Sequence, residues 1–313
     1  MTLVQLNYIV ALDTYKNFEK AAEQCFITQP TLSMQIQKLE EELGILIFDR
    51  SRKPVKTTEI GAKIVDQARV ILNETDRISE IINIESNEVK GILRLGIIPT
   101  IAPYLLPLFL VNFVDKFPNV NLIIDEIQTH EILNKLKSDE LDAAILVTPL
   151  DKSDIIEDPL FYEPFVAYIS EKHRLFEKEK IKSADLMLKD LWLLKEGHCF
   201  RDHIIQICDR YSKNEIPPET NISFEAGTID TLMKLVEHNF GMTLVPYLLA
   251  LEVRQTKKRK YLRDIEKPTP KREVSLIFKR AFVKRHLINL LKEEIIDSLP
   301  EELKNKRRGF VVG

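Results

Sequence analysis

The stretch ITQPTLSMQIQKLEEELG (residues 27–44) carries the signals of one complete helix. Thr28 can cap its start, and Pro30 falls in the first turn, where a missing N–H costs nothing. Gly44 is a typical C-terminal stop. Between these ends, apolar side chains recur at the spacing of one helix face, at Leu32, Ile36, Leu39 and Leu43.

Two shorter helices are expected before this one, so the first sixty residues predict a helix-turn-helix. Apolar residues at helical spacing mark them at Leu3, Leu6, Ile9 and Val10 and at Phe18, Ala21, Ala22 and Cys25. Such a unit places the N-terminal end of its last helix in the major groove of DNA. The polar side chains at that end suit base edges or phosphates, and they are Gln29, Thr31 and Ser33.

The segment from Ile45 to Lys56 predicts a two-stranded wing with a cluster of positive charge. The cluster suits contacts to the DNA backbone and consists of Arg50, Arg52, Lys53 and Lys56. Residues 1–60 hold seven Lys/Arg and eight Asp/Glu, and the whole chain has a formal net charge of -3. Any DNA contact must therefore come from a local patch, and a solvated turn is the alternative interpretation of this one. Three acidic residues could point away from DNA, namely Glu40, Glu41 and Glu42.

A long helix is expected to begin near Thr57 or Thr58. Its residues recur at spacings of three and four, as in a coiled-coil seam, at Ile60, Ile64, Ala68, Ile71, Thr75, Ile78 and Ile82. We expect a dimerisation helix. A helix packed on its own domain is the alternative.

From Gly91 onwards, short β-rich runs alternate with helices, which favours an α/β fold with a parallel sheet. The expected strands are 92–98, 120–127, 143–147, 165–170, 191–195, 222–225, 242–245 and 274–278. The expected helices are 103–116, 130–138, 200–211, 229–239 and 283–297. Because the chain returns to the first half after completing the second, we expect two lobes with a cleft between them.

The composition of the 313 residues narrows the class of protein further. No basic segment followed by an apolar stretch opens the sequence, and the longest apolar runs are too short to span a bilayer. Three cysteines, an odd number, do not suggest a secreted disulfide framework, so a reducing cytoplasm is expected. The spacing of the cysteines and histidines predicts neither a metal site nor a cofactor. Cys25, on an apolar helix face, is expected to be a core residue.

Residues 3–62 resemble the winged helix-turn-helix of the LysR family of bacterial transcription regulators. The matching pieces are Phe18 to Ala22, Thr28 to Ser33, Gln35-Ile36, Leu39-Glu40, Leu43-Gly44, Phe48 to Arg50 and Thr57 to Gly61. The resemblance implies a DNA-binding domain (1–60), an inter-subunit linker helix (61–90), a two-lobed sensing domain like periplasmic binding proteins (91–300) and a tail (301–313). It also implies a dimer of dimers on double-stranded promoter DNA, contact with RNA polymerase, no membrane and no enzymatic activity.

Cys199 and Cys208 lie nine residues apart in an expected helix. Nine rises of ~1.5 Å place their Cα atoms about 13 Å apart, whereas a disulfide needs roughly 4.4–6.8 Å. Joining the sulfurs would therefore unwind the helix and make this segment a two-state element.

Cys199 is expected at the helix start, beside His198 and near Arg201, where the helix terminus and cations would lower its thiol pKa. A peroxide would oxidise such a thiolate to a sulfenic acid, with which a second thiol could condense. Cys208 follows Ile204, Ile205 and Ile207, so we expect it to be buried. Two inert core cysteines are the alternative.

Residues 91–280 resemble the regulatory domain of the hydrogen-peroxide sensors within the LysR family. The matching pieces are Gly96 to Thr100, Pro103 to Pro107, Gln128 to His130, Gly197 to Cys199, Arg201-Asp202, Cys208 and Pro270 to Arg272. The resemblance implies that Cys199 reacts with peroxide, that Cys208 resolves it, and that glutaredoxin or thioredoxin reduces the disulfide. It assigns the peroxide or its water to the hydroxyls of Thr100 and Thr129, and stabilisation of the thiolate to His198 and Arg272, with Asp202 in the same site.

Each of these residues has a structural alternative. Thr100 and Thr129 could cap the helices that follow them, His198 could belong to a turn, and Arg272 could be a surface charge. The stretch from Asp209 to Asn221 is longer and more charged than expected for the family, and Lys304 to Arg308 is expected to be a solvated end. For the whole chain, the alternatives are a LysR regulator that binds a metabolite in the cleft, a thiol peroxidase and a dimeric adaptor.

Overall fold

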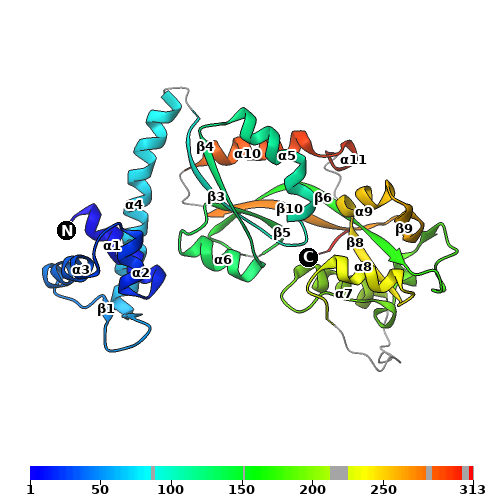
Figure 1. The fold of residues 1–313 in the computed structure, drawn as a ribbon, viewed down its shortest axis with the longest axis horizontal. Coiled ribbons are helices and arrows are strands. Elements are labelled where there is room, and N and C mark those ends of the chain that lie inside the picture. The colour runs from blue at the N-terminus through cyan, green and yellow to red at the C-terminus, as the bar shows by residue number, and fades with distance from the viewer. Residues whose placement is uncertain (86–88, 151, 212–224, 280–283, 305–309, 313) are drawn as a thin grey trace. The chain divides into compact units, whose positions relative to one another are not determined.

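The computed structural model describes residues 1–85, 89–150, 152–211, 225–279, 284–304 and 310–312 (Figure 1). The chain divides into two compact units, residues 1–89 with 281–285, and residues 90–280 with 286–313. In the described part of the chain, no helix is both long and apolar enough to cross a membrane.

The N-terminal unit is a winged helix-turn-helix followed by a long helix. Its elements are α1 (Leu3–Tyr15), α2 (Phe18–Gln24), α3 (Gln29–Leu43), β1 (Phe48–Asp49), β2 (Lys56–Thr57) and α4 (Glu59–Glu85). The expected ends of α3 are confirmed, because the Thr28 hydroxyl accepts from the Thr31 N–H and Gly44 takes a left-handed conformation with φ 68°. The short strands β1 and β2 pair antiparallel and form the wing.

Helix α4 packs on its own unit over its first turns. Val65 and Ala68 are buried in the same core as Leu32 and Ile36 of α3, and Arg69 forms an ion pair of 3.0 Å with Asp13. Further along the expected seam, the side chain of Ile78 is 61% exposed, whereas that of Ile82 lies outside the described residues. The first part of α4 therefore packs in the core of its own unit, and the role of the expected seam in dimerisation stays a prediction.

The C-terminal unit is a two-lobed α/β structure around a mixed sheet. Its helices are α5 (Ala102–Lys116), α6 (Thr129–Lys137), α7 (Cys199–Tyr211), α8 (Ile229–Glu237), α9 (Tyr247–Arg254), α10 (Arg285–Ser298) and α11 (Glu301–Lys304). Its strands are β3 (Gly91–Ile97), β4 (Val120–Glu126), β5 (Ala143–Thr148), β6 (Ile155–Ile169), β7 (Lys180–Ile181), β8 (Met242–Pro246), β9 (Leu262–Ile265), β10 (Pro270–Lys279) and β11 (Phe310–Val312).

The sequence predicts a parallel sheet, but the sheet in the structure is mixed. Its order is β4-β3-β5-β10-β6-β9-β7, and only part of it has the expected parallel direction, with β3 between β4 and β5. β10 runs antiparallel to both β5 and β6. The reason is that β10 and β6 each pass between the lobes, and the chain returns along them in opposite directions.

β6 connects the two lobes through a change of partner. Its residues up to Pro164 pair with β10, and those from Phe165 onwards pair with β8 and β9. Helices cover both faces of each lobe: α5 and α10 lie opposite α6 in the first, and α9 lies opposite α7 and α8 in the second (Figure 1). The change of partner thus falls where the two lobes meet.

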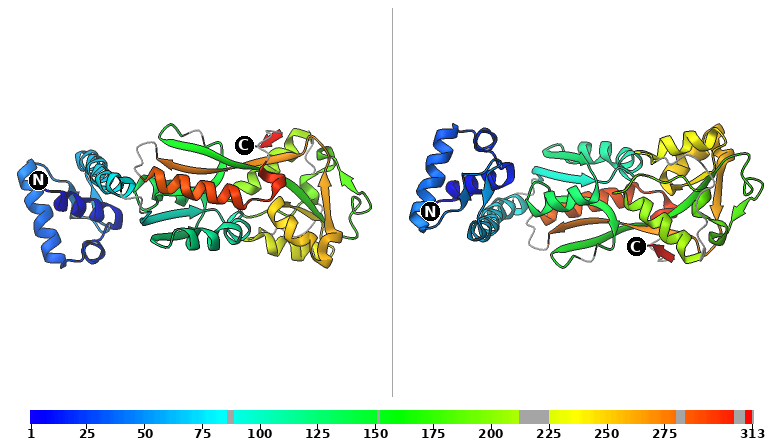
Figure 2. Two further views of the ribbon diagram at one scale, coloured as in Figure 1. Left: turned by 90° about the horizontal axis from the view of Figure 1, so that it is seen from above. Right: turned by 90° about the horizontal axis from the view of Figure 1, so that it is seen from below.

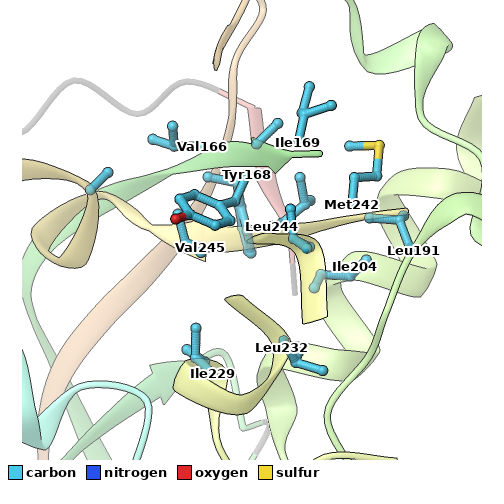
Figure 3. Packing of buried hydrophobic residues seen from close by; sticks show 14 of the residues in the cluster. Val166, Tyr168, Ile169, Leu191, Ile204, Ile229, Leu232, Met242, Leu244 and Val245 are labelled. Atoms are coloured by element: carbon cyan, nitrogen blue, oxygen red, sulfur yellow. The ribbon is translucent and has the colours of Figure 1, made fainter. Parts of the chain in front are cut away.

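Helix α7 packs into the core of the second lobe. Figure 3 shows Ile204 of α7 on the same side of β6 and β8 as Ile229 and Leu232 of α8. Phe200, Ile207 and Cys208 belong to the same buried cluster, each at 0% exposure. The α7 face that carries Cys208 is therefore part of the core.

One expected strand differs from the structure, and another lies mostly outside the described residues. The segment 191–195 forms only isolated bridges, of Leu191 to Met242 and of Leu194 to Ala226. Most of the expected strand 222–225 and of the unusual stretch from Asp209 to Asn221 lies outside the described residues. Their assignments stay predictions.

The C-terminal end belongs to the second unit and is more than a solvated tail. Lys304 closes α11, whose Leu303 is buried, and residues 305–308 lie outside the described part of the chain. β11 then pairs parallel with β10, setting Val312 against Arg272. Val312 is 4% exposed and packs in the cluster that holds Cys208, and β11 contacts α7 (Figure 2). Apolar residues beyond the basic stretch bring the chain back to the core.

Candidate functional site

A small cavity lies where the two lobes of the C-terminal unit meet, and Cys199 is part of its wall. Its lining residues come from the ends of β3 and β4 and from the start of α7: Ile98, Pro99, Thr100, Gln128, Thr129, Gly197, His198 and Cys199. Because the carboxyl ends of parallel strands share one edge of the sheet, Thr100 and Thr129 come together there. The cavity gives the centre of a water-sized molecule about 10 Å³, close to the minimum that holds one water.

Gly197 makes the wall of this cavity possible. Its φ of +93° is a conformation that side chains with a Cβ rarely adopt. A Cβ at this position would lie 2.7 Å from Oε1 of Gln128. Glycine therefore allows the segment before α7 to approach the start of α6 closely.

Arg272 lies beneath this cavity and is not a surface charge, since its side chain is only 1% exposed. Nη1 donates to the Thr100 hydroxyl at 2.9 Å, and Nη2 donates to the Thr100 carbonyl oxygen at 2.9 Å. The guanidinium carbon lies 5.1 Å from the ring centroid of Phe200, the second residue of α7. Arg272 thus links β10 to Thr100 in the cavity wall and to Phe200, the residue after Cys199.

Glu163 is a site residue that the sequence analysis missed. On β6 it faces Arg272 in register, and its Oε2 accepts from Arg272 Nε at 2.8 Å. The glutamate is 1% exposed, so the two residues form a buried ion pair. A Glu-Pro dipeptide inside an irregular strand is typical of a surface, and the partner is 109 residues away. No local signal could have identified it.

The pKa of the Cys199 thiol differs from our expectation. Burial raises the pKa of Cys199 above its ordinary value, although the charge of Arg272 and a hydrogen bond with Thr129 act to lower it. The residue itself is only half-buried, so some of its surface still meets solvent. The expectation that the helix start and neighbouring cations lower the pKa of Cys199 is therefore wrong for the thiol form of the protein, because the effect of desolvation is larger than theirs.

The neighbours of Cys199 contribute unequally to this balance. Burial lowers the pKa of His198, and the charge of Lys195 lowers it further, so the imidazole is neutral at neutral pH. Asp202 is exposed in the first turn of α7, and its charge raises the pKa of Cys199. Arg201 donates to the Leu194 carbonyl oxygen at 3.0 Å and pairs with Glu225 at 3.2 Å. Arg272 is thus the cation that favours the thiolate.

Neither threonine caps a helix. α5 begins after Ile101 without a side-chain cap, and the capping box of α6 consists of Gln128 and Glu131. The Thr100 hydroxyl accepts from Arg272 instead, which leaves its proton able to be donated elsewhere. The alternative interpretation, in which Thr100 and Thr129 serve only as helix caps, is therefore wrong.

The two cysteines of interest are both thiols and belong to one helix. Cys199 is the first residue of α7, and Cys208 is fully buried further along it. Cys25 is half-buried against the core of the N-terminal unit, and burial raises its pKa. The helical spacing of Cys199 and Cys208 keeps their Cα atoms about 13 Å apart.

The residues expected to bind DNA lie on the surface of the N-terminal unit and differ in exposure and in their contacts within the protein. Gln29, Arg52 and Lys53 are exposed, and Thr31 and Ser33 are half-buried. Thr31 shares a hydrogen bond of 2.8 Å with the Thr28 hydroxyl, and Arg52 pairs with Asp49 at 3.3 Å. Which of them contact DNA stays a prediction.

Arg50 differs from the other basic residues because it is tied to the fold. Its Nη2 lies 2.7 Å from Oε2 of Glu40, and its guanidinium lies 5.6 Å from the Phe18 ring centroid. Glu40 is buried, and its Oε1 accepts from the N–H groups of Ile47 and Phe48. Glu40 therefore fastens the wing to α3 and does not point into solvent.

Two family models match the chain, and between them they cover most of it. Residues 3–62 match the bacterial regulatory helix-turn-helix protein of the lysR family, and residues 86–300 match the LysR substrate binding domain. The fold, the wing and the two-lobed unit agree with this assignment. The chain therefore belongs to the LysR family of bacterial transcription regulators.

Its similar relatives are more specific. The chain is 36% identical to the hydrogen peroxide-inducible genes activator of Haemophilus influenzae over 89% of this chain and 91% of that protein. It is equally identical to the DNA-binding transcriptional dual regulator OxyR of Escherichia coli, over 89% and 90% of the two chains. Both similarities extend over 279 residues.

Solved structures of OxyR proteins have the same fold. A full-length OxyR variant from Pseudomonas aeruginosa superposes with a TM-score of 0.77 at 34% identity, over 94% of this chain and 97% of that one. A cysteine variant of Corynebacterium glutamicum OxyR, described as H2O2-bound, superposes with a TM-score of 0.62 at 27% identity, over 95% and 92%. The chain is thus a LysR regulator that resembles OxyR.

Proposed function

We propose that this LysR regulator responds to hydrogen peroxide through oxidation of Cys199 and a subsequent disulfide with Cys208. The observation that carries the proposal is the water-sized cavity in which the Cys199 thiol meets Thr100, Thr129 and His198. The cavity is near the minimum size for one water, so a molecule of two oxygen atoms is far closer to it in size than a metabolite of many atoms. The relatives named for peroxide response support the same assignment.

In the first step, the Cys199 thiolate attacks one oxygen of the peroxide, and the O–O bond breaks. Cys199 becomes a sulfenic acid, and the second oxygen leaves as hydroxide, which takes a proton to become water. Thr100 and Thr129 would hold the peroxide by hydroxyl hydrogen bonds. Arg272 would stabilise the negative charge of the thiolate and of the leaving oxygen.

In the second step, the Cys208 sulfur attacks the sulfenic sulfur, the S–S bond forms, and a second water leaves. This step requires α7 to unwind, because the helix holds the two Cα atoms about 13 Å apart and a disulfide allows roughly 4.4–6.8 Å. A thiol reductant such as glutaredoxin or thioredoxin would return two electrons and restore both thiols. The refolding would alter how subunits of a dimer of dimers meet on double-stranded promoter DNA, and so how RNA polymerase is contacted.

Tryptic mapping of the full-length reduced protein tests the proposal. Cleavage after Lys195, Arg201 and Arg210 places Cys199 and Cys208 on separate peptides, 196–201 and 202–210. After one equivalent of peroxide, we expect these peptides to be joined and Cys25 to remain a thiol. Cys208→Ser should accumulate a sulfenic acid at Cys199 that dimedone traps.

Cys199→Ser supplies the matched control. It should lose the joined peptides and the peroxide response while keeping promoter binding in a gel-shift assay. A normal peroxide response of Cys199→Ser contradicts the proposal. Binding of a small carboxylate in the cleft without any thiol reaction would instead support a metabolite-responsive regulator.

A further inference from the structure

Glu163 is buried at the junction of the lobes, yet none of the steps above uses it. Its Oε2 lies 2.8 Å from Nε and 2.7 Å from Nη2 of Arg272. Its Oε1 accepts from the N–H of Leu248, in the first turn of α9, at 2.9 Å. Both oxygens are therefore committed, and the carboxylate is held from two sides.

This carboxylate determines where the guanidinium of Arg272 points. Nε and Nη2 of Arg272 contact Glu163. In this orientation, Nη1 donates to the Thr100 hydroxyl and Nη2 to the Thr100 carbonyl oxygen, both at 2.9 Å. Because the Thr100 hydroxyl accepts from Arg272, its own proton is left for a molecule in the cavity. Glu163 thus acts on the cavity through Arg272 and Thr100.

The same pairing affects the charge that reaches the thiol. The groups around Cys199 are Arg272 from β10, Asp202 from α7, His198 before it and Thr129 from α6. The charge of Arg272 also acts on His203 of α7. Among them, Arg272 is the cation that favours the thiolate, and His198 is neutral. A carboxylate in contact with Arg272 offsets part of that positive charge.

We propose that Glu163 is a positioning residue for the Cys199 site, orienting Arg272 towards Thr100 and limiting the positive charge that acts on the thiol. The proposal deepens the proposed function, because it makes Glu163 a determinant of how readily Cys199 reacts. A buried carboxylate that serves only to neutralise a core arginine would need no connection to Thr100.

Glu163→Gln tests the proposal with the smallest change. The amide oxygen can still accept from Arg272, but the negative charge is lost, so the positive charge felt by Cys199 increases. The measurement is the pH dependence of iodoacetamide alkylation of Cys199 in the full-length protein, read on peptide 196–201 by mass spectrometry. We expect the midpoint to fall by about one pH unit, as when an opposite charge is strengthened, and alkylation at pH 7 to increase several-fold.

Two further variants separate this role from a merely structural one. Glu163→Gln/Arg272→Gln removes both charges and should move the midpoint above that of the wild type. A structural role alone would lower the melting temperature of Glu163→Gln without moving the midpoint, and an unchanged or raised midpoint overturns the proposal. If Glu163→Gln does not fold, Glu163→Asp tests the proposal, because aspartate keeps the negative charge but has a shorter side chain. We expect alkylation of Cys199 to stay near that of the wild type and the rate of oxidation by peroxide to fall. An unchanged rate of oxidation by peroxide overturns the proposal.

Alkylation also distinguishes this inference from the proposed function. Iodoacetamide reacts with a thiolate whether or not peroxide is the physiological signal. Wild-type protein that alkylates at Cys199 but does not react with peroxide would contradict the proposed function alone. The shift of the midpoint in Glu163→Gln would still support the role of Glu163.

Discussion

Cys199 opens helix α7, and Cys208 lies nine residues further along that helix, fully buried. Between them, Phe200, Ile204 and Ile207 are each 0% exposed in the core of the second lobe. Burial of each such side chain contributes about 1.5–3 kcal/mol, so unwinding α7 costs several kcal/mol that the S–S bond must offset. The packing of α7 therefore stabilises the reduced form and opposes the disulfide.

Thr100→Val should slow the reaction with peroxide while leaving alkylation of Cys199 by iodoacetamide nearly unchanged. The variant keeps the shape of the side chain but removes the hydroxyl proton that the cavity offers. Loss of one preorganised donor to a developing charge typically costs about 100-fold in rate, and we expect roughly 10- to 100-fold here because Thr129 remains. Stopped-flow oxidation of the reduced protein measures it, and an unchanged rate would remove Thr100 from the site.

His203 should make the reduced protein sensitive to acid. Burial, and then the charge of Arg272, lowers the pKa of His203 from 6.5 to about 4. Below pH 6.5, the unfolded chain binds the proton before the folded one, so stability falls as the pH drops towards 4 and no further below it. The loss between pH 7 and pH 5 should be about 2 kcal/mol.

Urea unfolding of the reduced wild type and of His203→Gln at the two pH values measures this effect. The glutamine does not titrate, so its loss of stability over that interval should be smaller by about the same 2 kcal/mol. Equal pH dependence of the two proteins would show that His203 is not the group responsible.

Lys53→Ala should weaken binding to all DNA sequences alike. Lys53 is exposed on the wing, whereas Arg50 is paired with Glu40, so Lys53 reports on DNA contact without disturbing the fold. The slope of log affinity against log salt should fall in magnitude by about 1 for each lost phosphate contact. Lys172→Ala, an exposed lysine of the regulatory unit, is the matched control, and equal slopes for the two variants would argue against a wing contact.

Oxidation should change the footprint of the protein on one promoter. If unwinding of α7 alters how subunits meet, the DNA-reading heads change their spacing, and adjacent half-sites one helical turn apart need heads roughly 34–36 Å apart. DNase footprints with and without peroxide measure this, with Cys199→Ser as the control that should show only the reduced pattern. Identical footprints of the wild type in both states would separate the thiol chemistry from DNA reading.

The local signals in the sequence were sufficient for much of the fold. Thr28, Pro30 and Gly44 fixed the ends of α3, because caps and stops depend on neighbours within a few residues. Likewise, the expected helix 200–211 agrees with α7, because helical periodicity needs no distant partner. The resemblance to the peroxide sensors, and not a local signal, placed Thr100, Thr129 and Cys199 in one site, and the structure brings them together around one cavity.

What the sequence could not predict depends on contacts far apart in the chain. The first half of β6 was missed because Pro159 and Pro164 interrupt its pattern. Pro159 lies at a register irregularity of the pairing with β10, and Pro164 lies where the strand changes partners. Glu163 and β11 became visible only with their partner β10. The predicted direction of the Cys199 pKa shift was also wrong, because desolvation depends on how the protein packs around the thiol.

Hydrogen–deuterium exchange over peptide 202–210 tests most directly whether the disulfide and the helix exclude one another. In the reduced protein, the amides of α7 should be protected, and after one equivalent of peroxide they should exchange as fast as those of an unstructured segment. Cys208→Ser, which cannot form the bond, should remain protected after the same treatment. A wild-type protein that contains the Cys199–Cys208 disulfide and keeps its reduced-state protection across α7 would contradict the account.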